Sequence, residues 1–170
     1  MLITSLLLLT LAQVAPVKTT LPGGMNVTRV DAALMCGGAT TDDAFPELRK
    51  QGFASVINLR LPDEAGVNVE ASRAAAEAAG LRYVHIPVRG SAPQPESVDA
   101  FLTAVRDPVN QPMYIHCATA NRVGAMWLIK RVLVDGWDVD RAAREAEAIG
   151  LTNASLRQFA LDYVAARQKR

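Results

Sequence analysis

Cys117 and Arg122 have the types and the spacing of residues that bind and attack an anion. Cys117 follows a short apolar run, 113–116, and four residues separate it from Arg122, after which a second apolar run begins. This pattern predicts a strand, a tight loop and a helix, with the backbone amides of the loop turned toward one centre. Together with the planar guanidinium of Arg122, such amides form a site for a small oxyanion.

The same loop favours the thiolate form of Cys117. The partial positive charge of a helix N-terminus and a nearby cation both stabilise a thiolate, which is a nucleophile at neutral pH. A buried, unreactive cysteine at a strand end is the alternative interpretation. Because strand, turn and helix start coincide at Cys117, we favour the catalytic interpretation.

Strands and helices are expected to alternate around this loop. Strands are expected at 26–30 and 33–36 (a short hairpin or two edge strands), 54–59, 83–88 and 113–116; helices are expected at 69–79, 96–106, 123–134, 138–149 and 153–167, and one capped by Thr40 or Thr41 that ends at Gln51-Gly52. This order predicts an α/β fold with a central, mostly parallel sheet of four to five strands flanked by helices. Ligands of such sheets bind beyond the carboxyl ends of the strands, where Cys117 lies.

Residues 1–20 are expected to be a signal peptide or an N-terminal anchor, followed by one domain at 21–170. The apolar run 2–12 is shorter than the roughly 20 residues of a membrane-spanning helix, and small residues follow it. Cleavage after Ala12 is favoured because Pro16 disfavours cleavage after Ala15. The run lacks the usual preceding positive charges, and a buried first helix is the alternative. We expect an exported protein, periplasmic or secreted, with a membrane contact only if this segment stays uncleaved.

Composition argues against several other classes of function. The 18 Lys and Arg nearly balance the 17 Asp and Glu, for a net charge of +1, so a nucleic-acid partner is not expected. Two Cys and two His, without metal-ligand spacing, predict neither a metal site nor a cofactor. The expected partner is a small phosphorylated or sulfur-containing substrate, or a phosphoprotein.

The segment His116-Cys117-x4-Arg122 resembles the signature loop of cysteine-based phosphatases. Segments 36–40, 56–60 and 80–88 resemble the bacterial family called beta-lactamase hydrolase-like, phosphatase-like domain, over most of residues 25–165. The resemblance implies a dual-specificity-phosphatase-like fold and cleavage of phosphomonoesters through a phospho-cysteine. It implies that Cys117 is the nucleophile and that His116 positions and activates it. It further implies that the oxyanion is bound by Arg122 and the backbone amides of the loop, namely those of Ala118, Thr119, Ala120, Asn121 and Arg122.

The loop also departs from the phosphatase pattern. It has four residues between Cys and Arg instead of five, as in rhodanese-type sulfurtransferases, which carry a persulfide on the cysteine. Val123 replaces the usual hydroxyl residue after the arginine, and Thr119 is the only hydroxyl in the loop. Ala120 stands where related loops often have glycine, which we expect to require a φ outside the left-handed region. A sulfurtransferase and a catalytically weak oxyanion-binding module are therefore alternative predictions.

A general acid is missing from its expected place. The segment 88–96 contains no aspartate, and Glu96, the one candidate, equally suits the first turn of a helix. Asp63 and Glu64 follow another strand at the same edge, and we expect solvated acids there rather than partners of Arg122. Arg89 would add positive charge near the site.

Cys36 is the second cysteine, and its Gly-Gly neighbourhood suggests a place near the catalytic loop. Either a reversible disulfide with Cys117 or a packed thiol is consistent with the sequence. His85 alternates with apolar residues and is expected to be structural. Trp127 and Trp137 are expected in or over the core.

Overall fold

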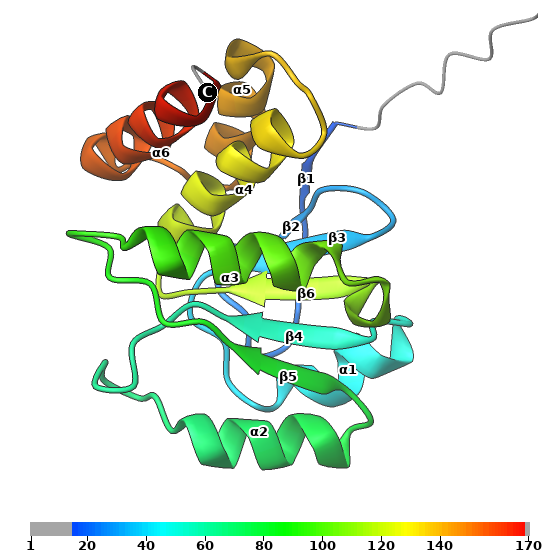
Figure 1. Cartoon of the computed structure of the whole chain (residues 1–170). Coiled ribbons are helices and arrows are strands. Elements are labelled where there is room, and N and C mark those ends of the chain that lie inside the picture. Colours follow the sequence, from blue (N-terminus) through cyan, green and yellow to red (C-terminus); the bar gives the residue numbers. More distant parts are fainter. Residues whose placement is uncertain (1–14, 169–170) are drawn as a thin grey trace, which may run out of the picture.

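A six-stranded sheet lies at the centre of the protein (Figure 1). The computed structural model describes residues 15–168. The strands are β1 (Val17–Lys18), β2 (Thr28–Arg29), β3 (Leu34–Gly37), β4 (Ser55–Asn58), β5 (Arg82–His85) and β6 (Met113–His116), in the spatial order β1-β2-β3-β6-β4-β5. The last four in this order are parallel, and β1 and β2 add an antiparallel edge. The α/β class is confirmed, and the sheet exceeds the expected four to five strands because the two-residue strand β1 extends it.

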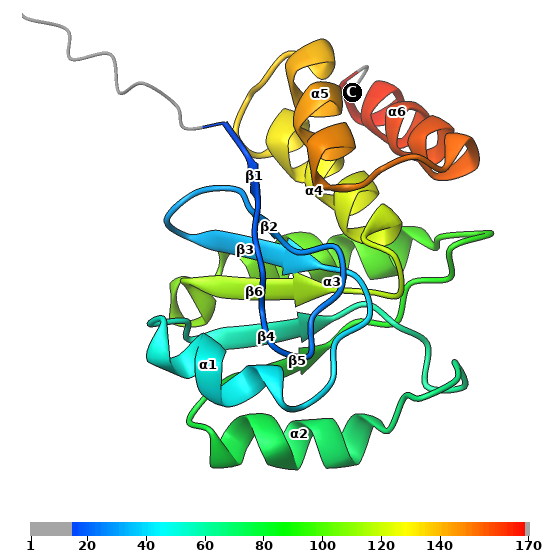
Figure 2. The same cartoon turned by 180° about the vertical axis from the view of Figure 1, so that it is seen from behind.

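Helices cover both faces of the sheet. They are α1 (Ala44–Lys50), α2 (Val69–Ala78), α3 (Pro95–Arg106), α4 (Asn121–Leu133), α5 (Val139–Ile149) and α6 (Ala154–Gln168). Side chains alternate between the faces along each strand, so Ile115 packs in the core under α3 to α6 while Tyr114 packs with α1 and α2. The helix α3 crosses in front of the sheet in Figure 1, and α1 lies in front of it in Figure 2. The strands β3, β4 and β6 are buried along their whole length, as their apolar sequences predict.

Several elements differ from the sequence prediction, and one of them is β5, which ends at His85 rather than Val88. The hairpin of β2 and β3 is confirmed, but β3 is an inner strand because β6 pairs with its other side. The helix α1 begins at Ala44, with Asp43 rather than a threonine at its N-cap, and no side chain caps it. The helix α4 begins at Asn121 rather than Val123, which places Arg122 inside its first turn.

The described N-terminal residues belong to the sheet. Strand β1 begins at Val17, before the expected domain start at Leu21. Lys18 Nζ donates hydrogen bonds to Asn26 Oδ1 at 2.6 Å and to the Ile149 carbonyl at 3.2 Å, which ties this strand to the end of α5. The expected signal core, residues 2–12, lies outside the described residues. Within residues 15–168, no helix combines the length and the apolar character needed to cross a membrane.

A buried ion pair joins α4 to α5 behind the loop. Arg131 donates to both oxygens of Glu145, with Nε at 2.6 Å from Oε2, and Trp127 Nε1 donates to the same Oε2 at 2.9 Å. Trp127 is 3% exposed and Trp137 packs against the core, as expected. The middle and the end of α4 are therefore held against α5.

Candidate active site

Cys117 lies at the carboxyl end of the central strand β6. Its backbone N–H donates to the Gly37 carbonyl at 3.3 Å, and the carbonyl of the preceding His116 accepts from Leu59 N at 2.9 Å. Contacts to both neighbouring strands thus fix the backbone of His116 and Cys117. Cys117 is 1% exposed, so its thiol sits at the floor of the loop rather than on the surface.

The backbone amides that follow Cys117 form an unoccupied donor set. Among the described residues, none accepts a hydrogen bond from the backbone N–H groups of residues 118–123; the first such bond of α4 runs from Gly124 N to the Ala120 carbonyl at 2.9 Å. The first backbone N–H groups of a helix usually have no partner within the helix. Here the turn before α4 adds three more such groups, those of residues 118–120. This is the arrangement that binds an oxyanion.

Ala120 closes the loop in a left-handed conformation. Its φ is 71°, so the expectation that this φ would avoid the left-handed region is wrong. A non-glycine residue there costs about 1 kcal/mol or more, and such strain persists only where the surroundings impose it. Ala120 is fully buried, and a Cβ on Gly150 would stand 3.0 Å from the Ala120 Cβ, so close packing with the α5–α6 connection imposes the turn.

Arg122 is held by the ends of two other strands. Nη1 donates to the Leu59 carbonyl at 3.2 Å and to the Val88 carbonyl at 2.9 Å, just beyond β4 and β5. The Nη1–Nη2 edge of the guanidinium faces Glu64, with Nη1 bound to Oε1 and Nη2 to Oε2 at 2.9 Å. No side-chain or backbone oxygen within residues 15–168 accepts from Nε–H, and the charge of Cys117 acts on the same guanidinium, so we expect the Nε–Nη2 edge to be the one available to a ligand.

Glu64 is a partner of Arg122, which corrects the expectation of a solvated loop acid. Its carboxylate also accepts from Arg60 Nε at 3.1 Å and from Leu61 N at 2.8 Å. The hydrogen bonds from Arg122 lower the pKa of Glu64 to about 2, against the opposing effect of burial. Burial lowers the pKa of Arg122, but the hydrogen bonds and charge of Glu64 and the charge of Cys117 more than offset this and raise it. Asp63 is exposed, as expected.

His116 is buried directly before Cys117. Its ring stacks on Tyr114, with centroids 6.0 Å apart, and neither ring nitrogen has a hydrogen-bond partner among the described residues. Burial lowers its pKa to about 3, and the nearby charges of Arg60 and Arg122 add to this, so the ring is neutral at pH 7. The predicted role of His116 therefore stays a prediction, and a neutral ring restricts it to positioning. His85, by contrast, is a satisfied structural residue, with Nε2 2.8 Å from the Arg60 carbonyl.

Two asparagines fix the loop from outside. Asn121 Oδ1 accepts from the backbone N–H groups of Thr152 at 2.8 Å and Asn153 at 2.7 Å, and its Nδ2 donates to Thr119 Oγ1 at 3.1 Å. Asn26 Nδ2 donates to the Thr119 carbonyl at 3.2 Å. Sequence reasoning assigned only a backbone role to Asn121 and missed Asn26, because nothing in the sequence relates residue 26 to residue 119.

An open depression of about 330 Å³ lies over the loop, and we call it the site depression. It is lined by Leu61, Glu64, Arg89, Gly90, Ser91, Thr119, Asn121, Arg122, Asn153 and Leu156. Glu64 is the only carboxylate in this set. Glu96 is exposed in the first turn of α3, as expected for a helix start, and Asp99 accepts from Tyr163 Oη at 2.8 Å. Neither acid lines the depression.

Cys36 is buried in β3, in register with Ile115 on β6. Its thiol approaches the Thr28 carbonyl, with Sγ 3.8 Å from the oxygen, and burial raises its pKa far above the ordinary value. Cys36 and Cys117 are both free thiols in this structure. A disulfide between them stays a prediction.

Fold and loop together define a phosphatase-like protein of the dual-specificity and tyrosine phosphatase superfamily. The family model described as "DSP-PTPase phosphatase fused to NAD+ Kinase" matches residues 8–162, and the chain belongs to this family. The bacterial resemblance is also confirmed. The chain is 31% identical over 130 residues to the beta-lactamase hydrolase-like protein of Xylella fastidiosa (strain Temecula1), which covers 74% of this chain and 28% of that protein. The corresponding Agrobacterium fabrum protein is 31% identical over 113 residues, covering 64% and 26%.

Solved structures share the fold at lower identity. A putative phosphatase (DUF442) from Shewanella putrefaciens superposes with a TM-score of 0.71 at 23% identity, covering 86% of this chain and 95% of that one. TpbA of P. aeruginosa gives a TM-score of 0.66 at 20% identity, covering 88% of each chain. These likenesses establish the architecture around the loop, while the chemistry has to be argued from this chain's own residues.

Proposed function

We propose that this chain is a cysteine-dependent phosphatase that cleaves phosphomonoesters through a phospho-cysteine on Cys117. The proposal rests on the backbone N–H groups of residues 118–123, which donate to no acceptor in the described chain. These groups directly follow the buried thiol of Cys117. A tetrahedral oxyanion with three terminal oxygens suits such a ring of donors. The free Nε–Nη2 edge of Arg122 adds two parallel donors of the kind that phosphate accepts.

The reaction has two displacement steps. In the first, the Cys117 thiolate forms an S–P bond while the bond from phosphorus to the leaving oxygen breaks, and that oxygen takes the electron pair. In the second, a water oxygen forms a bond to phosphorus and the S–P bond breaks, which restores the thiolate and releases phosphate; the proton of the water passes to solvent. The amides and Arg122 bind the three equatorial oxygens in both steps, where charge builds up in the transition state.

The named relatives support a phosphatase over the alternatives. The solved structures of this fold include the putative phosphatase from Shewanella putrefaciens and a complex of TpbA with phosphotyrosine. The bound phosphotyrosine belongs to TpbA; for this chain it supports a phosphomonoester as the ligand class. We also propose that the protein acts outside the cytoplasm, on the pattern of residues 2–12, which cell fractionation would test.

Hydrolysis of p-nitrophenyl phosphate by the full chain under reductant tests the proposal. Cys117→Ser should abolish turnover because a serine hydroxyl is not ionised at neutral pH. Cys36→Ser is the matched control: it makes the same atom change at the other buried thiol, and its hydroxyl can still donate to the Thr28 carbonyl. Turnover that survives Cys117→Ser would refute the proposal, as would an inactive wild-type chain that binds phosphate.

A further inference from the structure

Arg89 stands at the rim of the site depression with no assigned role. It directly follows Val88, whose carbonyl binds Arg122 Nη1 at 2.9 Å. The next residue, Gly90, packs on the Arg122 side chain, since a Cβ there would lie 3.8 Å from Arg122 Cδ. The backbone of residues 88–90 is therefore fixed against the oxyanion-binding arginine.

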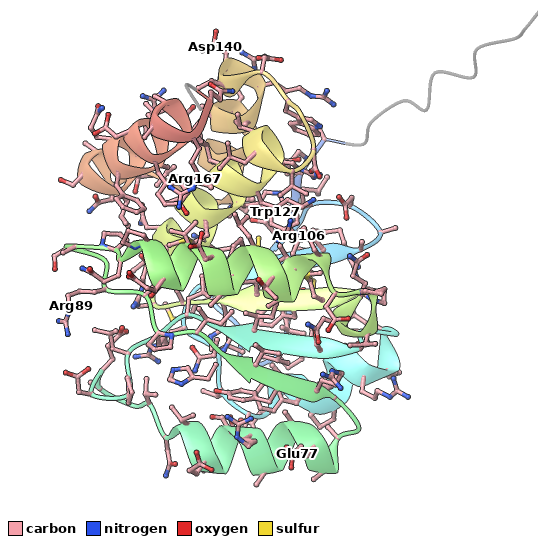
Figure 3. The ribbon with its side chains drawn as sticks, viewed as in Figure 1. Glu77, Arg89, Arg106, Trp127, Asp140 and Arg167 are labelled. Carbon is pink, nitrogen blue, oxygen red and sulfur yellow. The ribbon has the colours of Figure 1, made fainter. Side chains whose placement is uncertain are left out.

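The charge of Arg89 is not neutralised by the protein. Arg89 is exposed, and its side chain forms no hydrogen bond or ion pair within the described range 15–168, although its carbonyl accepts from Ala92 N at 3.2 Å. Figure 3 shows its side chain reaching out from the loop between β5 and α3. The only carboxylate of the depression, Glu64, already accepts from Arg60, Arg122 and Leu61 N. Arg89 thus leaves the depression with an uncompensated positive charge.

The position of Arg89 matches the side from which a leaving group departs. Cys117 is buried, and Thr119, Asn121 and Arg122 of its loop line the open depression, so we infer that an in-line displacement sends the leaving oxygen toward this depression. That is the side on which Arg89 lies. A guanidinium there would bind an anionic group of the leaving group and stabilise the negative charge that develops on it.

The positive charge of Arg89 matters more because the site, within the described residues, has no general acid. No carboxylate of the depression is free to protonate a leaving oxygen, and Glu96 and Asp99 lie outside its lining. A leaving group that departs as a stable anion needs no proton. A phosphate group is such an anion, and it would also give Arg89 a negatively charged partner.

We propose that Arg89 is a specificity-determining residue, which selects substrates whose leaving group carries a phosphate, with phosphoric anhydrides as the preferred class. This inference rests on the proposed function, which it deepens. In the reaction the Cys117 sulfur takes the terminal phosphoryl group, the P–O bond of the anhydride breaks, and the second phosphate leaves with the electron pair. The Arg89 guanidinium then stabilises the negative charge of the departing phosphate, which needs no proton from the protein.

The first test compares inorganic phosphate and pyrophosphate as competitive inhibitors of p-nitrophenyl phosphate hydrolysis. Arg89→Gln should weaken pyrophosphate about fivefold, because one charge-assisted contact is lost, and should leave phosphate inhibition nearly unchanged. Arg144→Gln is the matched control: Arg144 is also exposed, lies on α5 and has no partner in the described chain. An equal loss for both anions, or no loss, would overturn the inference.

A second test does not depend on turnover. Calorimetric binding of pyrophosphate and of phosphate to Cys117→Ser, with and without Arg89→Gln, measures the same selectivity at fixed ionic strength. A selective loss of pyrophosphate binding in the double variant supports the role of Arg89 even if the wild-type chain proves inactive. Unchanged pyrophosphate binding contradicts that role even if the wild-type chain is an active phosphatase.

Discussion

The carboxylate of Glu64 binds the guanidinium of Arg122 through both of its oxygens, between a loop after β4 and the first turn of α4. Two backbone carbonyls, those of Leu59 and Val88, accept from the same Nη1. Arg122 is thus oriented without a ligand, and under the proposed function its Nε–Nη2 edge would bind phosphate without a change of side-chain position. A preorganised donor loses little entropy when it binds and serves the transition state directly.

Replacement of Glu64 by glutamine should reduce phosphatase turnover. The amide keeps the volume of the side chain but accepts through only one atom, so Arg122 loses one of its two hydrogen bonds to residue 64. We expect kcat/KM for p-nitrophenyl phosphate to fall by about tenfold to a hundredfold, as for other small misplacements of a binding group. Glu70→Gln, at an exposed acid on α2, is the control. Equal activity of the two variants would show that Glu64 does not position Arg122.

Glu64 should also contribute to the pH dependence of stability. Its pKa falls from 4.5 to about 2 on folding, so its stabilising effect is complete above pH 4.5 and is lost as the pH falls toward 2. The difference in free energy of unfolding between the wild type and Glu64→Gln should therefore shrink over this range. Urea denaturation at a series of pH values measures it. A difference that is constant from neutral pH to pH 2 would contradict the ion pair.

The rate should depend steeply on the acidity of the leaving group. Since no described carboxylate is placed to protonate the leaving oxygen, alkyl phosphates should forgo the acid catalysis that typically contributes 10²–10⁴-fold. Hydrolysis of p-nitrophenyl phosphate and of glycerol phosphate by the same preparation measures the difference. Similar kcat/KM values for the two substrates would reveal a proton donor that this account lacks.

Asn121 offers a way to separate loop anchoring from anion binding. Asn121→Ala removes the acceptor for Thr152 N and Asn153 N and should lower the free energy of unfolding by about 1–2 kcal/mol. Asn121→Asp keeps that acceptor but places a negative charge beside the amides, so it should mainly weaken phosphate binding. Chemical denaturation and calorimetry on both variants test this. A loss of phosphate binding in Asn121→Ala alone would contradict the assignment.

The sequence predicted where Cys117 and Arg122 lie in the fold, but not the residues that hold the loop and Arg122 in place. Cys117 and Arg122 are close in the chain, and local patterns place both at a strand end and a helix start. Glu64 lies 58 residues from Arg122, and its pairing depends on how β4 and β6 adjoin in the sheet, which periodicity does not show. The same is true of Asn26, which is 93 residues from Thr119.

Two further differences have local physical causes. The left-handed φ of Ala120 is imposed by tertiary packing against Gly150, which overrides the preference of an alanine. Strand β1 was not predicted because it has only two residues, both exposed, which are too few to show an alternation of apolar and polar side chains.

Cys117 itself should become phosphorylated during turnover. Rapid acid quench of the full chain during turnover of p-nitrophenyl phosphate, followed by peptide mass spectrometry, tests it directly. We predict the added mass of one phosphoryl group on the peptide that contains Cys117, and none on the peptide that contains Cys36. Steady turnover without a phosphoryl group on Cys117, or a persulfide there after incubation with thiosulfate and transfer of its sulfur to cyanide, would contradict the account.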